Sequence, residues 1–166
     1  GYDGTTGFYE MFVNGGIGTG GNGTDICISK FSSDGDSLKY STYLGGGGNE
    51  NPHSLVVNDN YELFILGSTG SSDYPTTNNA YDTSFNNGDF FGFINYPANS
   101  NSYYLEYPIG TDIVVTKFSP DGSNLLGSTF IGGSKNDGIN ESGANNINGN
   151  KLCYFYADEY RGEITL

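Results

Sequence analysis

Hydrophobic positions along the chain alternate with polar ones in short runs, and glycine- and asparagine-rich breaks separate these runs. Period-two runs rich in Tyr, Phe, Ile, Val and Thr are typical of β-strands with one buried face. Good helix formers are scarce, and no stretch requires a helix to explain it. Because the apolar residues come in runs that can build a core, the pattern predicts an ordered all-β protein instead of a disordered chain.

One pair of runs occurs twice. The segment Thr24–Gly35 returns as Thr111–Gly122, an offset of 87 residues, and Ser41–Gly46 returns as Ser128–Gly133 with the same offset. Each first run ends on an Asp-Gly pair, which tolerates the positive φ of a tight turn. Each copy is therefore predicted to be an antiparallel hairpin, and a fixed period indicates stacked or radial units.

A second type of hairpin is predicted between the two copies. The segment Ser54–Gly67 has two apolar runs around an Asn-Asp-Asn turn. Two hairpins per period give four antiparallel strands, the content of one β-propeller blade, and radial packing of blades protects their edges. The expected fold is all-β, with β-propeller blades of four antiparallel strands, as a partial propeller of about two blades from a larger chain.

The repeat also predicts where the units begin and end. We expect residues 1–46 to form the second half of one blade and residues 47–133 to form one full blade with an inserted loop at 89–110. Residues 134–166 are expected to start a further blade, with an insertion at 141–160. The insertions fall between predicted strands, as expected when strands are buried and loops lie on the surface.

The net charge of the chain limits the classes of partner that we expect it to bind. The formal net charge is −13, from 19 acidic and 6 basic residues. This balance repels nucleic acid phosphates and anionic lipids, and no apolar run approaches the roughly 18 residues of a membrane span. We expect no nucleic acid partner, no membrane insertion and no cofactor. Ca²⁺ is the one ion that the acidity favours, although Asp34 and Asp36 form a poor calcium loop because Leu38 stands where an oxygen ligand is needed.

Catalytic patterns are absent from the sequence. The only histidine, His53, is expected in a surface turn, with no serine or cysteine in a nucleophile-elbow context. One histidine and two distant cysteines do not make a zinc site. The segment Gly16–Gly21 matches the GxGxxG phosphate-binding pattern, but a predicted strand follows it instead of the required helix.

The two cysteines indicate little about redox chemistry. Cys27 stands where the second copy has Val114, so it is predicted to be a small apolar core residue. Cys153 belongs to another predicted aromatic strand. Two buried thiols are favoured, and a disulfide between them stays open for an oxidising compartment.

Several motifs resemble one repeat family. The segment Gly67–Thr77, the following Ala80–Asp82 and the strand Tyr40–Gly46 resemble the pattern of the seven-bladed β-propeller repeat family called SBBP. The resemblance covers about two thirds of the chain and implies the propeller fold. It also implies a secreted or cell-surface bacterial protein, similar in the Bacteroidota to cargo of the type IX secretion route. No catalytic residues come with the motif.

The inserted loop carries the candidate binding residues. Tyrosines and asparagines suit stacking and hydrogen bonding to sugars or to a protein partner, and packing of the insert onto its own blade is the alternative. The candidate ligand-binding side chains are Tyr96, Tyr103, Tyr104 and Tyr107.

We therefore expect a non-catalytic, extracellular or cell-surface scaffold for binding, adhesion or structure. Its expected partners are the remaining blades of the same protein and a surface glycan or protein, with type IX secretion or gliding machinery as a carrier. The alternative is a carbohydrate-active hydrolase or lyase built on a propeller, for which Asp158, Glu159 and Glu163 are clustered acids.

Overall fold

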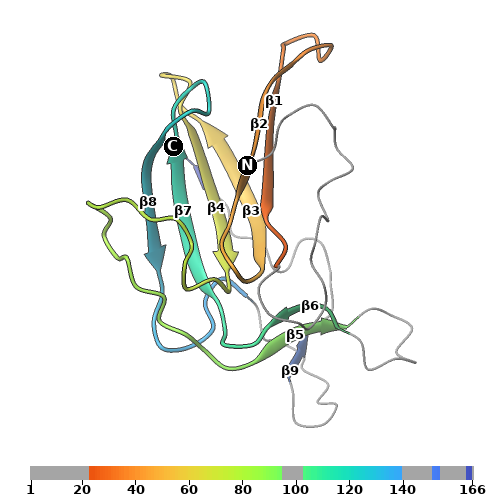
Figure 1. Cartoon of the computed structure of the whole chain (residues 1–166), viewed down its shortest axis with the longest axis vertical. Helices are drawn as coiled ribbons and strands as arrows, with labels where there is room; N and C mark the ends of the chain where they lie inside the picture. The colour runs from red at the N-terminus through yellow and green to blue at the C-terminus, as the bar shows by residue number, and fades with distance from the viewer. Residues whose placement is uncertain (1–22, 95–102, 140–150, 154–163, 166) are drawn as a thin grey trace.

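The computed structural model describes residues 23–94, 103–139, 151–153 and 164–165 (Figure 1). All regular elements in these ranges are β-strands, which confirms the prediction of an all-β protein. No helix long and apolar enough to cross a membrane occurs in these ranges. The strands are β1 (Ile26–Phe31), β2 (Leu38–Leu44), β3 (Glu50–Val57), β4 (Leu63–Thr69), β5 (Phe91–Ile94), β6 (Tyr103–Tyr107), β7 (Asp112–Phe118), β8 (Leu125–Ile131) and β9 (Lys151–Cys153).

The strands form three sheets. β1 and β2 pair as a hairpin, and β3-β4-β7-β8 form a four-stranded antiparallel sheet in that order. The third sheet has the order β6-β5-β9, and its β5–β9 pair is parallel, which differs from the antiparallel pairing expected throughout. β5 and β6 lie within the insertion at 89–110 and pair outside the four-stranded sheet. No sheet closes on itself among the described strands, so the propeller blade stays a prediction.

The 87-residue repeat of sequence is also a repeat of structure. Cys27 lies opposite Tyr43 in the β1–β2 hairpin, as Val114 lies opposite Phe130 in β7–β8. The register also shifts at the same place in both hairpins, before the last residue of the first strand. Since a one-residue slip would turn every side chain to the other face, this agreement fixes equivalent faces in the two copies.

Both hairpins also use the same turn. The backbone N–H of Gly35 donates to Ser32 O at 2.9 Å, and that of Gly122 donates to Ser119 O at 2.9 Å. The two glycines have φ of +79° and +71°. A residue with a Cβ is strained at such φ values, which explains the Asp-Gly pair at each turn.

The core lies between the β1–β2 hairpin and one face of the four-stranded sheet. Ile26 and Ile28 of β1 are buried with Leu63 and Ile65 of β4. Figure 1 shows the hairpin standing beside the β3 edge of the sheet. Over β7 and β8 the buried cluster includes Tyr74, whose ring lies 6.0 Å from that of Phe130. The cluster is completed by Leu44, Val114 and Phe118.

Two expectations about single residues need correction. His53 lies in β3 instead of a surface turn, beside a register shift in the β3–β4 pairing, and its Nε2 is 3.2 Å from Ser68 Oγ. Cys27 is a free thiol that is only half-buried, whereas its counterpart Val114 is 1% exposed. In β1 the core is reached by Ile26 and Ile28, on the opposite strand face, whereas in β7 it is reached by the face of Val114 and Phe118.

Candidate functional site

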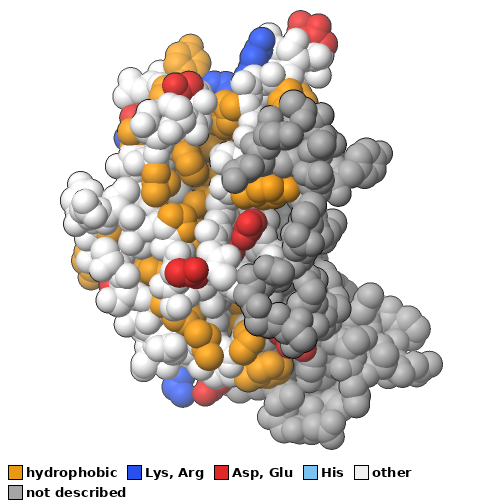
Figure 2. All heavy atoms as spheres, in the orientation of Figure 1, with side chains coloured by type: hydrophobic (Ala, Val, Ile, Leu, Met, Phe, Trp, Pro, Cys, Tyr) orange, Lys and Arg blue, Asp and Glu red, His pale blue; other side chains and the backbone are white. Residues whose placement is uncertain are grey.

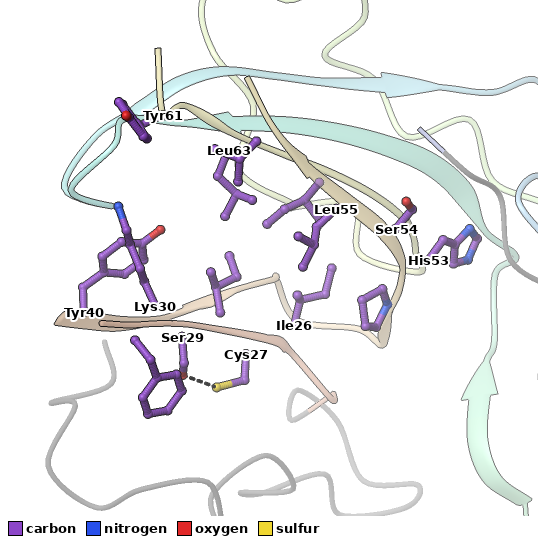
Figure 3. A pocket seen from close by; sticks show the side chains of 15 residues that line it. Ile26, Cys27, Ser29, Lys30, Tyr40, His53, Ser54, Leu55, Tyr61 and Leu63 are labelled. Atoms are coloured by element: carbon purple, nitrogen blue, oxygen red, sulfur yellow. Dashed lines mark hydrogen bonds between the residues drawn. The ribbon is translucent and has the colours of Figure 1, made fainter. Parts of the chain in front are cut away.

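A groove of about 740 Å³ lies between β1 and the β3–β4 pair (Figure 3). Ile26 of β1 and Leu55 and Leu63 of β3 and β4 point toward each other across it, while Cys27 and Ser29 point to the other side of the hairpin. Strand alternation explains this division, because successive side chains point to opposite faces. The groove is a concave apolar site of a size typical for ligand pockets.

Part of the groove wall is open to solvent. Leu55 is 67% exposed and Val57 is 51% exposed, although they share a sheet face with buried Leu63 and Ile65. Tyr61, in the turn after β3, is 70% exposed and has a φ of +60°. None of the described lining residues carries a carboxylate. The exposed wall is therefore apolar, with polar atoms mainly at its ends.

Lys30 and Tyr40 connect the hairpin to the larger sheet at the mouth of this groove. Lys30 Nζ lies 5.9 Å from the Tyr40 ring centroid and donates to Pro120 O at 2.9 Å. The Tyr40 ring lies against Gly122, where an added Cβ would meet Tyr40 Cε2 at 2.6 Å. The turn between β7 and β8 thus contacts the tip of the preceding hairpin, which holds the two sheets together at this end.

A buried carboxylate lies at the opposite end, at the start of β3. Glu50 is 3% exposed, and its Oε1 accepts hydrogen bonds from Thr69 Oγ1 and Ser71 Oγ, each at 2.5 Å. Its Oε2 accepts the Gly46 N–H at 3.2 Å. Burial raises the pKa of Glu50 to about 7, the hydrogen bonds oppose this rise, and the charge of Asp25 adds to it.

Asp25 and Glu50 form a carboxyl pair beside Gly45. Burial raises the pKa of Asp25, a hydrogen bond with Glu50 opposes part of this rise, and the charge of Asp73 adds to it. A hydrogen bond between two carboxyl groups requires one of them to hold a proton, which agrees with the raised pKa of Glu50. A Cβ at Gly45 would overlap oxygens of both side chains, so only glycine fits there.

The second copy repeats this arrangement with Asp112 and Asp137. Asp137 Oδ2 accepts the Gly133 N–H at 2.8 Å, and the Asp137 N–H donates to Thr111 O at 2.7 Å. Asp112 is fully buried, and its Oδ2 accepts the Asn86 N–H at 2.7 Å. Burial raises the pKa of Asp112, and the charge of Asp137 raises it further. These carboxylates therefore hold loops onto strand ends in both copies.

Among residues 23–94, 103–139 and the short described segments, no group of three or more His, Cys, Asp or Glu side chains could hold an ion. Asp34 and Asp36 instead accept hydrogen bonds from Ser32 Oγ at 2.6 and 3.1 Å within their turn. Binding of Ca²⁺ stays a prediction.

The four tyrosines of the insertion do not line the groove. Tyr96 lies outside the described residues, and Tyr103 and Tyr104 belong to β6, in a different sheet from the groove. Tyr107 is fully buried, with its ring 6.2 Å from that of Phe91. Tyr107 is thus a packing residue here, and ligand binding by the group stays a prediction.

Sequence reasoning missed both the groove and the carboxyl pair. Glu50 and Asp137 are separated by the same 87 residues as the two hairpins, so the repeat itself contained a signal for the pair. The groove had a weaker signal in the alternating Leu55 and Val57. No family model matches the chain, and neither a curated protein nor a solved structure is detectably similar to it.

Proposed function

We propose that the chain is a segment of a secreted or cell-surface β-propeller of the SBBP type that works as a non-catalytic scaffold for binding, adhesion or structure. The observation that carries this proposal is the repeated hairpin, whose register and turn are the same in both copies. A unit that keeps its strands and varies its connections is suited to build an extended surface for partners. The remaining blades and a surface glycan or protein are its proposed partners.

The chemistry of the hollow supports binding over catalysis. The groove is apolar, and in Figure 2 the Asp and Glu side chains of the visible face are scattered over several places. The buried acids lie at strand ends, where loop N–H groups and hydroxyl groups bond to both oxygens of Glu50 and to Oδ2 of Asp112. Carriage by type IX secretion or gliding machinery is part of the proposal and rests on the family resemblance.

A carbohydrate-active hydrolase or lyase is the second candidate, and the Asp25–Glu50 pair favours it. A carboxyl group with a pKa near 7 beside a second carboxyl group is the arrangement that general acid catalysis uses. Against it, the Glu50 side chain is almost wholly buried and already bonded to Thr69 and Ser71. A substrate would have to displace these contacts to reach it.

One assay separates the two candidates. The chain is incubated with a panel of bacterial and algal polysaccharides, and retention in affinity gels is measured together with release of reducing or unsaturated ends. The scaffold proposal predicts retention on at least one polysaccharide or cell-surface extract without new ends. Release of ends that Glu50→Gln abolishes, while the variant keeps its fold by circular dichroism, would establish the enzyme instead.

A further inference from the structure

Among the described strands, β1 pairs with a neighbour on one edge only, whereas its counterpart β7 pairs on both edges. In the four-stranded sheet β7 lies between β4 and β8. β1 corresponds to β7 and β2 to β8, and β1 pairs with β2 in the β7–β8 register. Within the described part of the chain, no strand pairs with the other edge of β1. In the four-stranded sheet β4 pairs with one edge of β7. The corresponding edge of β1 therefore has no paired strand among the described residues.

Side-chain burial also differs between β1 and β7, on the strand face that points away from the groove, whereas Ile26 and Ile28 on the groove face are buried. Phe118 of β7 is 8% exposed, whereas its counterpart Phe31 is 46% exposed. Thr116 is fully buried, whereas its counterpart Ser29 is exposed. The paired residues are alike in character, so their surroundings cause the difference. In the second copy those surroundings are β4 beside the strand and Tyr74 over it, whose hydroxyl is 2.9 Å from Thr116 Oγ1.

The groove follows this open edge. Its far wall holds Leu55 and Val57, which are exposed although Leu63 and Ile65 on the same sheet face are buried. An apolar strip that continues into a core and stays open to solvent marks an interaction site. The edge offers main-chain groups and the groove offers apolar contact, which together suit the addition of a β-strand.

We propose that the open edge of β1 and the groove form one docking surface, and that its occupant is a β3–β4-type hairpin from a neighbouring repeat. This inference rests on the proposed repeat scaffold. The β4-type strand of that hairpin pairs antiparallel with β1 in the register that β4 has with β7. The neighbouring repeat then completes a second four-stranded sheet, of which β1 and β2 are the last two strands.

The register specifies which side chains fill the groove. Phe64 pairs with Lys117 and Leu66 with Val115 in the four-stranded sheet. Shifted by the 87-residue repeat, the docked strand places an aromatic residue opposite Lys30 and an aliphatic residue opposite Ile28. Residues opposite each other across a sheet share one face, so both side chains enter the groove with Ile28.

The second copy shows which contacts the docked strand would make. Lys117 Nζ lies 5.3 Å from the centroid of the Phe64 ring, a cation–π contact that Lys30 would repeat with the docked aromatic residue. Gly67 is the residue opposite Val114, so a small residue is expected opposite Cys27. The aliphatic side chains of the docked strand would cover Leu55 and Val57, which removes apolar surface from water.

The test supplies the hairpin within the chain. A copy of residues 47–110 is inserted between Gly23 and Thr24, so that β3, β4 and their connection precede β1 as they precede β7. Amide hydrogen exchange is then measured along β1 in the original and the extended chain. We expect the β1 amides that do not bond to β2 to exchange at least ~10-fold more slowly in the extended chain.

Two exchange results would overturn the inference. One is unchanged exchange of these amides in an extended chain whose inserted strands are protected. The other is strong protection of the same amides already in the original chain, because residues 1–22 would then occupy the edge.

A substitution gives a second and independent measurement. Leu55→Asp, placed in the native copy of the hairpin, is compared in both chains, with Leu126→Asp as the control because Leu126 is also exposed but lies on β8, outside the groove. We expect Leu55→Asp to lower the melting temperature of the extended chain by several degrees more than that of the original chain, and Leu126→Asp to act equally in both. Equal effects of Leu55→Asp in the two chains would contradict docking.

These results are separable from the test of the scaffold function. Polysaccharide retention is measured on the original chain and does not require the inserted hairpin. A chain that binds without turnover but fails the exchange test would keep the scaffold and lose this docking surface. A chain that turns over polysaccharide but passes the exchange test would lose the scaffold function and keep the docking surface.

Discussion

Glu50 and Asp137 occupy the same place in the two copies of the repeat. Each accepts the backbone N–H of the second glycine after the hairpin, Gly46 at 3.2 Å and Gly133 at 2.8 Å. Each also donates its own backbone N–H to the threonine that precedes the hairpin, at 2.8 Å to Thr24 O and 2.7 Å to Thr111 O. The acid after the double glycine therefore closes the hairpin in both copies, and the longer Glu50 reaches further into the protein.

The raised pKa of Glu50 predicts that stability falls as pH rises. Folding raises this pKa from an ordinary value of 4.5 to about 7, so the folded chain binds more protons than the unfolded chain between these values. The stabilisation is complete below about pH 4.5 and is lost by about pH 7, with an upper size on the order of 3 kcal/mol. Urea unfolding at about pH 5 and about pH 7.5 measures it.

Glu50→Gln is the control for this pH effect. The amide keeps the size of the side chain and cannot titrate, so the Glu50 part of the slope should disappear. Asp25, the other member of the pair, and the nearby Asp73 are unchanged in the variant. General repulsion from the acidic surface remains in both the original protein and the variant, since the original net charge is −13. An equally steep pH dependence in the variant would show that Glu50 titrates normally.

A chain of buried hydroxyl groups lies over the core, and removing two different members of it should lower the free energy of unfolding by different amounts. Tyr74 Oη is 2.9 Å from Thr116 Oγ1, which is 3.0 Å from Ser128 Oγ. Tyr74→Phe leaves the Thr116–Ser128 bond intact and should lower the free energy of unfolding by about 1 kcal/mol. Thr116→Val leaves two buried hydroxyl groups without this partner and should lower it by about 2 kcal/mol or more.

Denaturant unfolding of both variants and of the double variant tests this chain of hydrogen bonds. The double variant should cost less than the sum of the single variants, because the two residues share one bond. Strict additivity would mean that Tyr74 and Thr116 do not interact in solution.

The two turn glycines should respond differently to the same substitution. A Cβ added at Gly35 would lie in open space, whereas a Cβ at Gly122 would meet the Tyr40 ring at 2.6 Å. Alanine at either positive φ costs about 1 kcal/mol, and the clash at Gly122 adds about 1 kcal/mol or more. Thermal unfolding of Gly35→Ala and Gly122→Ala measures the difference.

Removing the Tyr40 ring provides the control for that comparison. In a Tyr40→Ala background the two glycine substitutions should cost the same, because only backbone strain remains. A persistent difference would mean that Tyr40 does not lie against the β7–β8 turn in solution.

Lys117 is expected to contribute little to stability through its ion pair with Glu62. Their N–O distance is 2.8 Å, but both side chains are partly exposed, and exposed pairs are screened by salt. Lys117 lowers the pKa of Glu62. Lys117→Met should therefore raise this pKa in an NMR titration and change the melting temperature only slightly. A large loss of stability that persists at about 1 M salt would show a packing role instead.

The sequence was sufficient for the hairpins because their information is local. Asp34-Gly35 and Asp121-Gly122 define the turns, and alternating residues on either side define the register. His53 was misplaced because Pro52 and the neighbouring asparagines favour a turn, whereas pairing with β4 holds the segment in a strand.

Other features depend on contacts that sequence spacing does not encode. The parallel pairing of β5 with β9 joins segments far apart in the chain, as the partners Phe91 and Lys151 show. The groove lies between β1 and the β3–β4 pair, which come from separate parts of the chain, so no local pattern specifies it. Glu50 could have been found by extending the repeat comparison beyond Gly46, but its pKa depends on burial beside Thr69 and Ser71.

The connection between β4 and β7 has a consequence for engineering. It runs from Gly70 to Thr111 and forms β5 and β6 outside the four-stranded sheet, while β4 and β7 remain paired along their length without a break in register. Foreign peptides grafted into the part of this connection that follows Phe85, so that Tyr74 and Phe85 keep their packing on Phe130, would be displayed at one end of the sheet without changing its strand order. The same place would let natural variants acquire new specificity by exchanging one segment while the surrounding strands stay as they are.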